Sequence, residues 1–116
     1  MKQRQQQQGG NRTGGKAQKL SFEEGQRRLG ELKGWTIGDD GKSISCQLAM
    51  KDFTTAVDFI RNIAQIAEAL DHHPDVHLTG YRNLVIVLST HSVGGLSEND
   101  FILASKIDAL PKSLNK

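Results

Sequence analysis

Cysteine, aromatic residues and long apolar runs are all scarce in this chain of 116 residues. The single cysteine, Cys46, cannot form an internal disulfide, so we expect a reducing compartment. No apolar run approaches the roughly 18 residues that a transmembrane helix needs, and the N-terminus lacks the apolar stretch of a secretory signal. We therefore expect a cytoplasmic protein without a membrane partner. The acid-free, Arg-bearing N-terminus leaves a nuclear or organellar location open.

The first 19 residues differ in composition from the rest of the chain. They read MKQRQQQQGGNRTGGKAQK and carry five basic and no acidic residues, while the whole chain is +2, so residues 20–116 carry −3. A segment with so few apolar residues cannot form a core. We predict a disordered basic tail over residues 1–19 and a single domain over residues 20–116. A basic tail can touch nucleic acid, but we interpret it as a solvated linker and expect no nucleic-acid partner.

Three helices are predicted from N-terminal capping residues followed by apolar residues at helical spacing. Their expected N-caps are Ser21, Asp52 and Ser97. We expect the first helix to end at Gly34, since glycine commonly closes helices. The second helix is expected over residues 53–70, and Pro74 would stop it, because the residue before a proline is pushed out of the helical conformation.

Four strands are predicted from short apolar or alternating runs that are bounded by turn residues. They are expected over residues 35–37, 43–50, 76–81 and 84–90. Residues 84–88 of the last run are all apolar, so it should be a central strand that is covered on both faces. The order α-β-β-α-β-β-α predicts an α+β fold, with a four-stranded antiparallel sheet and three helices packed on one face.

The long helix is expected to carry two apolar stripes, which is more than one packing surface can cover. The first stripe consists of Phe53, Ala56, Val57, Ile60, Ala64 and Ala67, and the second of Phe59, Ile63, Ile66 and Leu70. A small domain has a modest core, so we expect the second stripe to meet another surface. We predict a homodimer or homotetramer through this helix and the sheet edge. A helical protein partner would satisfy the same stripe.

Histidine is the residue type that points to chemistry in this sequence. His72 and His73 are expected to close the long helix and His91 to follow the apolar strand, so the three can converge at element ends. An imidazole with an ordinary pKa of about 6.5 can donate or accept a proton near neutrality. A histidine near a helix C-terminus is also favoured by the helix dipole without any function.

A zinc site is the alternative reading of these histidines, because three of them, with His77 included, could supply a His₃ ligand set. Neighbouring helical residues point about 100° apart, however, which makes His72 and His73 awkward joint ligands. The sequence also has no Cys-x-x-Cys or His-Glu-x-x-His pattern. We therefore predict no metal site.

One spacing pattern connects these residues: an acid, three residues, His-His-Pro, an aromatic residue, nine residues, a histidine and a later aspartate. It is formed by Glu68, His72, His73, Pro74, Tyr81, His91 and Asp100. In this pattern the chain resembles the pterin-4a-carbinolamine dehydratases, and the resemblance covers about residues 20–110. Trp35 also matches a family tryptophan. Six residues separate Pro74 from Tyr81 where many members have five.

The resemblance implies an enzyme that dehydrates a 4a-hydroxytetrahydropterin, the species left when aromatic amino acid hydroxylases oxidise tetrahydrobiopterin. His72, His73 and His91 are then the catalytic residues that exchange protons with a small pterin substrate. No metal, nucleotide or redox cofactor is implied. Animal members also act as coactivators that dock on the dimerisation helices of a homeodomain transcription factor, which leaves a non-catalytic binding module as the alternative.

The other predicted site residues would bind or position this substrate. Glu68 lies one helical turn before His72 and could orient its ring, although a solvated helix charge is the alternative. Asp100 is expected to brace the loop after His91. Trp35 either covers the pterin ring or belongs to the core, and Pro74 belongs to the same predicted substrate site.

Overall fold

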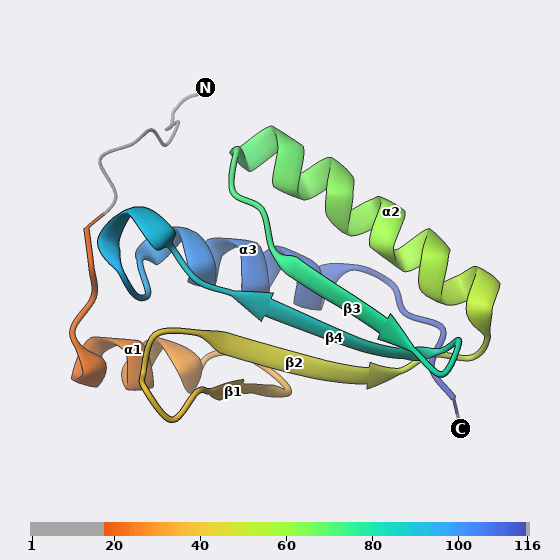
Figure 1. Ribbon diagram of the computed structural model, residues 1–116, viewed down its shortest axis with the longest axis horizontal. Coiled ribbons are helices and arrows are strands. Elements are labelled where there is room, and N and C mark those ends of the chain that lie inside the picture. Colours follow the sequence, from red (N-terminus) through yellow and green to blue (C-terminus); the bar gives the residue numbers. More distant parts are fainter. Residues whose placement is uncertain (1–17, 116) are drawn as a thin grey trace.

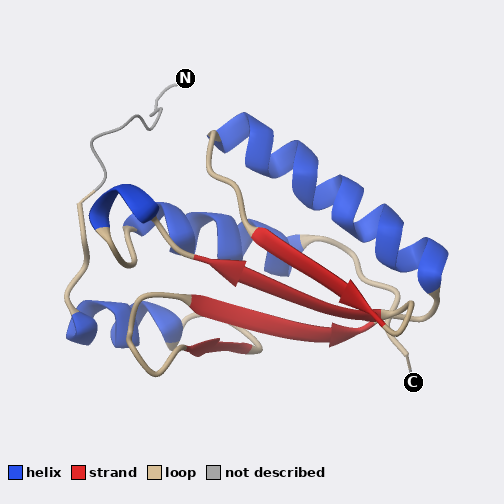
Figure 2. Ribbon diagram, in the orientation of Figure 1, coloured by secondary structure: helices blue, strands red, loops and turns tan. Residues whose placement is uncertain are grey.

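The computed structural model describes residues 18–115 and contains one antiparallel sheet with three α-helices (Figures 1 and 2). In chain order the elements are α1 (Phe22–Leu29), β1 (Trp35–Ile37), β2 (Ile44–Ala49), α2 (Phe53–Leu70), β3 (Asp75–Thr79), β4 (Asn83–Leu88), the 3₁₀ helix η2 (His91–Val93) and α3 (Glu98–Ala109). The predicted α+β class and element order are confirmed. Of the predicted tail, only Gln18 and Lys19 lie among the described residues.

The sheet has the strand order β1-β2-β4-β3, and neighbouring strands are antiparallel. β4 is central, as predicted, but the expectation that both its faces are covered is wrong. Leu84, Ile86 and Leu88 are buried, whereas Val85 and Val87 on the other face are only half-buried. The helices cover one face of the sheet (Figure 2), so alternate residues of β4 point away from them.

α2 packs on the sheet through a line of residues that differs from the predicted stripes. Ala56, Phe59, Ile63 and Ala67 are the buried residues of this helix. Phe59 and Ile63 were assigned to a partner surface, and this assignment is wrong because they face the sheet. The residues left on the outer side of α2 come from the other predicted stripe. We call them the outer stripe: Phe53 and Ala64 are exposed, and Val57 and Ile60 are half-buried.

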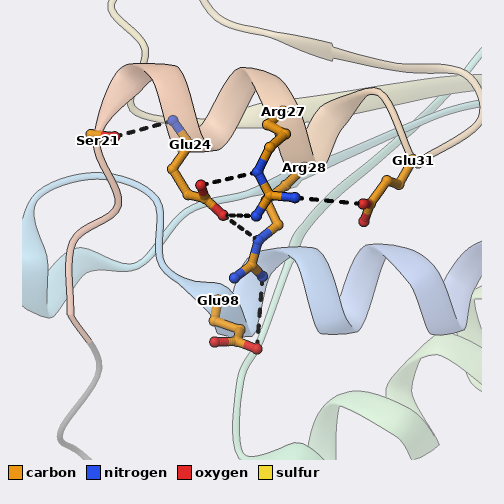
Figure 3. A network of polar contacts seen from close by, with 6 residues as sticks. All are labelled: Ser21, Glu24, Arg27, Arg28, Glu31 and Glu98. Carbon is orange, nitrogen blue, oxygen red and sulfur yellow. Dashed lines mark hydrogen bonds and ion pairs between the residues drawn. The ribbon is translucent and has the colours of Figure 1, made fainter.

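α1 is shorter than predicted and is fastened by a network of charged side chains (Figure 3). It ends at Leu29 instead of near Gly34, whose φ of 77° places it in the turn that leads into β1. Glu24 binds Arg27 and Arg28, and these hydrogen bonds lower the pKa of Glu24 from its ordinary value of 4.5 to about 2. Arg28 also reaches Glu98 at the start of α3, at 3.7 Å.

No helix within residues 18–115 is long and apolar enough to cross a membrane. At the end of the described chain, residues 113–115 run beside β2, with Asn115 N donating to Ala49 O at 2.8 Å. Lys112 closes α3, because its Nζ donates to the carbonyl oxygens of Ile107, Asp108 and Leu110 at 2.9–3.1 Å. A cation at the C-terminus of a helix also interacts favourably with its dipole.

Candidate active site

The two adjacent histidines lie just beyond α2 and point in different directions. The helix ends at Leu70, and Asp71 takes the left-handed conformation with φ 53° that closes it. The predicted helix bounds of 53–70 are thus confirmed, and His72 and His73, which were expected to close the helix, lie beyond its end. The side chain of His72 is 13% exposed, whereas that of His73 is 55% exposed. One histidine is thus turned into the fold and the other toward solvent.

His72 is paired with Asp100, the carboxylate in the first turn of α3. His72 Nε2 lies 2.6 Å from Asp100 Oδ1, and Asp100 is fully buried. The prediction that Glu68 orients His72 is therefore wrong. It assumed that the helix continues to His72, and once the helix has ended the four-residue spacing no longer places the two side chains on one face.

The other oxygen of Asp100 holds the segment between η2 and α3. Asp100 Oδ2 accepts from Thr90 Oγ1 at 2.8 Å and from the Ser97 backbone N–H at 3.0 Å. Ser97 Oγ lies 2.7 Å from Thr90 Oγ1. Because Thr90 uses its only hydroxyl hydrogen on Asp100, Ser97 donates to Thr90. Asp100 thus touches the loop after His91, as predicted, and it also holds His72.

This cluster determines which nitrogen of His72 is free for proton exchange. An ionised carboxylate can only accept hydrogen bonds, so we assign the ring hydrogen of His72 to Nε2, which then donates to Asp100. In the neutral ring, Nδ1 then bears the lone pair. Hydrogen bonds from three groups also satisfy the buried carboxylate, which would otherwise be costly to desolvate. Thr90 and Ser97 belong to the site but were not predicted, although the capping-box spacing of Ser97 and Asp100 pointed to this contact.

His73 forms a second histidine–carboxylate pair on the outside of the fold. Its Nε2 lies 2.6 Å from Glu68 Oε2, and the Glu68 side chain is 74% exposed. The pair lies at one end of an apolar pocket of about 200 Å³ between α2 and β3. The pocket is lined by Ile60, Ile63, Ala64, Ala67, Glu68, His73, Pro74 and Val76. The structure therefore brings Glu68, His73 and Pro74 together.

His91 is exposed at the first position of η2, directly after Thr90. Within residues 18–115 its ring makes no hydrogen bond or ion pair with another side chain. Thr90 connects it through the backbone to the Asp100 cluster, because the Thr90 hydroxyl is bound to that carboxylate. The ring of His91 is thus available for an incoming molecule.

Three other residues singled out in the sequence lie away from this cluster. Trp35 is 6% exposed, and its indole N–H donates to Asp108 Oδ1 at 2.8 Å, near the opposite end of α3 from Asp100. The structure thus supports the core alternative for Trp35. Tyr81 lies in the turn between β3 and β4, with the Arg82 guanidinium over its ring. His77 is exposed on the edge strand β3.

The side chains that could hold a metal ion do not gather at this site. Within the described part of the chain, no group of three or more His, Cys, Asp or Glu side chains is placed to hold one. The site presents three imidazole rings, two of which are held by carboxylates, and an imidazole can donate or accept a proton near neutral pH.

Residues 18–110 match the protein-family model described as pterin 4 alpha carbinolamine dehydratase. The chain belongs to this family. It is 42% identical over 93 residues to "Pterin-4-alpha-carbinolamine dehydratase 2, mitochondrial" from Arabidopsis thaliana, and the match covers 78% of the chain but only 50% of that protein. It is 48% identical over 86 residues to a putative pterin-4-alpha-carbinolamine dehydratase from Saccharolobus islandicus, covering 72% of the chain and 86% of the relative.

Solved structures of dehydratase-like proteins share the fold. A crystal structure titled as a transcriptional coactivator/pterin dehydratase from Brucella melitensis matches with a TM-score of 0.74 and 36% identity, covering 78% of this chain and 96% of that one. A pterin dehydratase-like protein described as a RuBisCO assembly factor in the alpha-carboxysome matches with a TM-score of 0.56. It is only 21% identical, so it supports the fold alone.

Proposed function

We propose that this chain dehydrates 4a-hydroxytetrahydrobiopterin, a pterin-4a-carbinolamine, to quinonoid dihydrobiopterin and water in tetrahydrobiopterin recycling. The observation that carries the proposal is the His72–Asp100 pair at 2.6 Å, inside the segment that matches the family. It is supported by relatives at 42% and 48% identity that are named as such dehydratases. The residues assigned to the reaction are His72, His73 and His91.

The reaction needs one proton delivered and one removed. A general acid protonates the 4a-hydroxyl group, the C4a–O bond breaks, and water leaves as the N5 lone pair forms the C4a=N5 double bond. A general base then takes the proton from N5, so protons balance and no electrons are exchanged. Two positioned imidazoles can perform these steps, and each such transfer typically contributes about 10²–10⁴-fold to the rate. No redox step needs a cofactor.

The exposed histidines His73 and His91 are the stronger candidates for direct proton exchange. Both are accessible, and Glu68 holds the ring of His73. His72 is mostly buried and bound to Asp100, so we assign it the role of a fixed base that acts through Nδ1. Pro74 and the apolar pocket beside His73 offer a surface for the flat pterin ring.

A dehydration assay tests this proposal. The carbinolamine is generated with an aromatic amino acid hydroxylase, quinonoid dihydropterin formation is followed, and wild type is compared with His73→Ala. We expect acceleration over the spontaneous reaction and a loss of about 10²–10⁴-fold in the variant. His77→Ala is the matched control, because His77 is an exposed histidine on β3.

The outcomes separate the activity from the assignment of residues. If His73→Ala accelerates the reaction as much as wild type does, the proposed activity stands and the proton transfer is assigned to His72 and His91. No acceleration by the folded wild type contradicts the proposed activity. Wild-type rates after all three histidines are replaced by alanine contradict the histidine mechanism.

A binding role is the second candidate function, and the outer stripe of α2 favours it. Phe53 is 54% exposed at the start of the helix, and the apolar pocket adjoins Ile60 and Ala64. The Brucella protein is titled a transcriptional coactivator as well as a dehydratase. A helix of a second copy or of another protein would cover this stripe. We propose that a second copy of this chain covers the outer stripe, in a homodimer or homotetramer formed through α2 and the sheet edge.

A further inference from the structure

The first described residues run beside the loop between η2 and α3. The Leu20 backbone N–H donates to Leu96 O at 2.8 Å, and the half-buried Leu20 side chain packs against the core. Figure 1 shows this segment, in orange, passing the turn that leads into α3. The contact joins positions 76 residues apart in the chain, so it fixes the segment to a loop that carries part of the candidate site.

Lys19 covers the neighbouring position of the loop with its aliphatic stem. A Cβ atom built on the buried Gly95 would lie 2.9 Å from Lys19 Cε and 3.7 Å from Cδ and Cγ. The stem therefore lies directly on the Gly95 backbone, where a side chain would otherwise project. A lysine stem often covers apolar surface in this way while its ammonium group stays in water.

The loop under Lys19 and Leu20 connects two parts of the site. Thr90 N donates to Gly95 O at 2.7 Å, which closes the segment that contains His91. Two residues after Gly95, the Ser97 N–H donates to Asp100, the carboxylate that holds His72. Displacement of this loop would thus move His91 at one end and the Asp100 cluster at the other.

α1 supports the same loop from the side. A Cβ atom on the buried Gly25 would lie 3.8 Å from Leu96 Cδ1, so the helix passes close to the loop at that position. Figure 3 shows Arg28 reaching Glu98, the first residue of α3. The loop is therefore held between a helix on one side and residues 19 and 20 on another.

We propose that Lys19 and Leu20 form a strap over the loop of residues 94–97, and that Lys19 is a positioning residue for His91 and for the His72–Asp100 pair. This inference rests on the proposed dehydratase function. The strap acts through the packing of the Lys19 stem on Gly95 and through the Leu20–Leu96 hydrogen bond. The strap affects the placement of the proton-transferring groups. Its loss should therefore lower kcat and change KM little.

A double-mutant cycle in the full-length chain tests the strap. Lys19→Ala removes the stem, and Gly95→Ala inserts a methyl group that displaces it. The displaced atoms are the flexible end of a side chain, so the fold can accept this methyl group. We expect each single variant to lower kcat by about threefold to tenfold with little change in KM or Tm, because small misplacements of catalytic groups are costly. The double variant should be no slower than either single variant.

Two further variants separate packing from charge and from general surface effects. Lys19→Met keeps an unbranched stem without the ammonium group and should restore most of the wild-type kcat. Lys42→Ala removes an exposed lysine from the turn between β1 and β2 and should leave kcat unchanged. Wild-type kcat in Lys19→Ala, or multiplicative losses in the double variant, would overturn the strap. Lys19→Met behaving like Lys19→Ala would overturn the packing mechanism.

Amide hydrogen exchange without substrate distinguishes failure of the strap from failure of the proposed function. In Lys19→Ala the amides of Leu20, Thr90 and Gly95 should exchange about tenfold faster than in wild type, since local opening of the loop becomes easier. Amides in β4 should keep their wild-type rates. Equal protection of the loop amides in both proteins overturns the strap even if the enzyme is active. If the loop amides exchange faster in Lys19→Ala but wild type has no dehydratase activity, the strap is supported and the proposed activity is rejected.

Discussion

Asp100 carries no surface exposure, yet its two oxygens accept hydrogen bonds from His72, Thr90 and Ser97. At the scale of single residues this carboxylate determines the orientation of one imidazole. An amide at the same position offers an N–H₂ group where His72 now finds an acceptor. The ring would then have to accept on Nε2 and carry its hydrogen on Nδ1.

We therefore expect Asp100→Asn to lower kcat by about 10²–10⁴-fold while the protein remains folded, because the ring of His72 is held in the wrong tautomer. The measurement is the steady-state dehydration rate together with a thermal unfolding curve. Glu68→Gln is the control. Glu68 is the exposed partner of His73, so loss of its charge should lower kcat by less than about tenfold. A folded Asp100→Asn variant with wild-type kcat contradicts the role of the pair.

Trp35 gives a second residue-scale prediction. Its indole N–H donates to the half-buried Asp108, so Trp35→Phe should lower the free energy of unfolding by about 1 kcal/mol through the lost hydrogen bond. Chemical denaturation measures this loss, and kcat/KM should stay within about twofold of wild type. A large rise in KM without loss of stability would instead support the contact with the pterin ring.

The positions of the candidate residues were easier to predict than their contacts. His72, His73 and His91 were expected at element ends, and the structure places the first two just beyond α2 and His91 at the first position of η2. The partner of His72 was missed because helical spacing favoured Glu68, whereas a left-handed Asp71 ends the helix and turns His72 toward α3. A contact between residues 28 positions apart depends on how α2 and α3 pack, which local spacing does not encode.

At the scale of elements, the charged network of α1 predicts a pH dependence of stability. The pKa of Glu24 is lowered to about 2 by Arg27 and Arg28 in the folded protein, against an ordinary 4.5. A lowered pKa in the folded state means that the stabilisation is present above pH 4.5. It is lost as the pH falls from about 4.5 to about 2, because the carboxylate becomes protonated.

Glu24→Gln should thus lower Tm at pH 7 by about 1–3 °C, a small effect because the network is exposed and screened by salt. The difference from wild type should shrink below pH 4.5 and with added salt. Thermal unfolding at several pH values measures it. Glu23→Gln is the control, since Glu23 lies in the same helical turn and is exposed. A difference that persists unchanged at pH 2 contradicts the ion-pair origin.

Element boundaries were predicted correctly where a residue type strongly prefers one local conformation. They were missed where the residue type is common in more than one. Asp52 accepts from the Thr55 N–H at 2.9 Å and begins α2 as expected. Gly34 was assigned to a helix end, but its positive φ belongs to the turn before β1. Glycine permits both conformations, so its presence alone could not decide.

For the whole molecule, the outer stripe of α2 predicts self-association. Charge at its centre should oppose this, because an isolated carboxylate is costly to bury in an apolar interface. We expect wild type to sediment as a dimer or tetramer at micromolar concentration and Val57→Glu to shift it to monomer. Gln65→Glu, on an exposed position of the same helix, is the control. A wild-type monomer under these conditions contradicts the proposal.

The fold as a whole followed from the order of elements, but the side of α2 that faces the sheet did not. Both stripes are apolar, and a sequence pattern of this width fits two rotations of the helix. The packing of Phe59 and Ile63 against the sheet selects one rotation. Similarly, the apolar run of residues 84–88 in β4 suggested two covered faces, while the valines of its open face are only half-buried.

Cys46 is the only thiol in the chain, and it is 4% exposed on a central part of the sheet, opposite Ile86. Burial raises its pKa, so little reactive thiolate is present in the native protein. A thiol reagent should label it at least about 100-fold more slowly than the denatured chain, at a rate set by transient opening of the sheet. The protein thus contains a natural chemical reporter of its own unfolding, which needs neither an engineered label nor an optical probe.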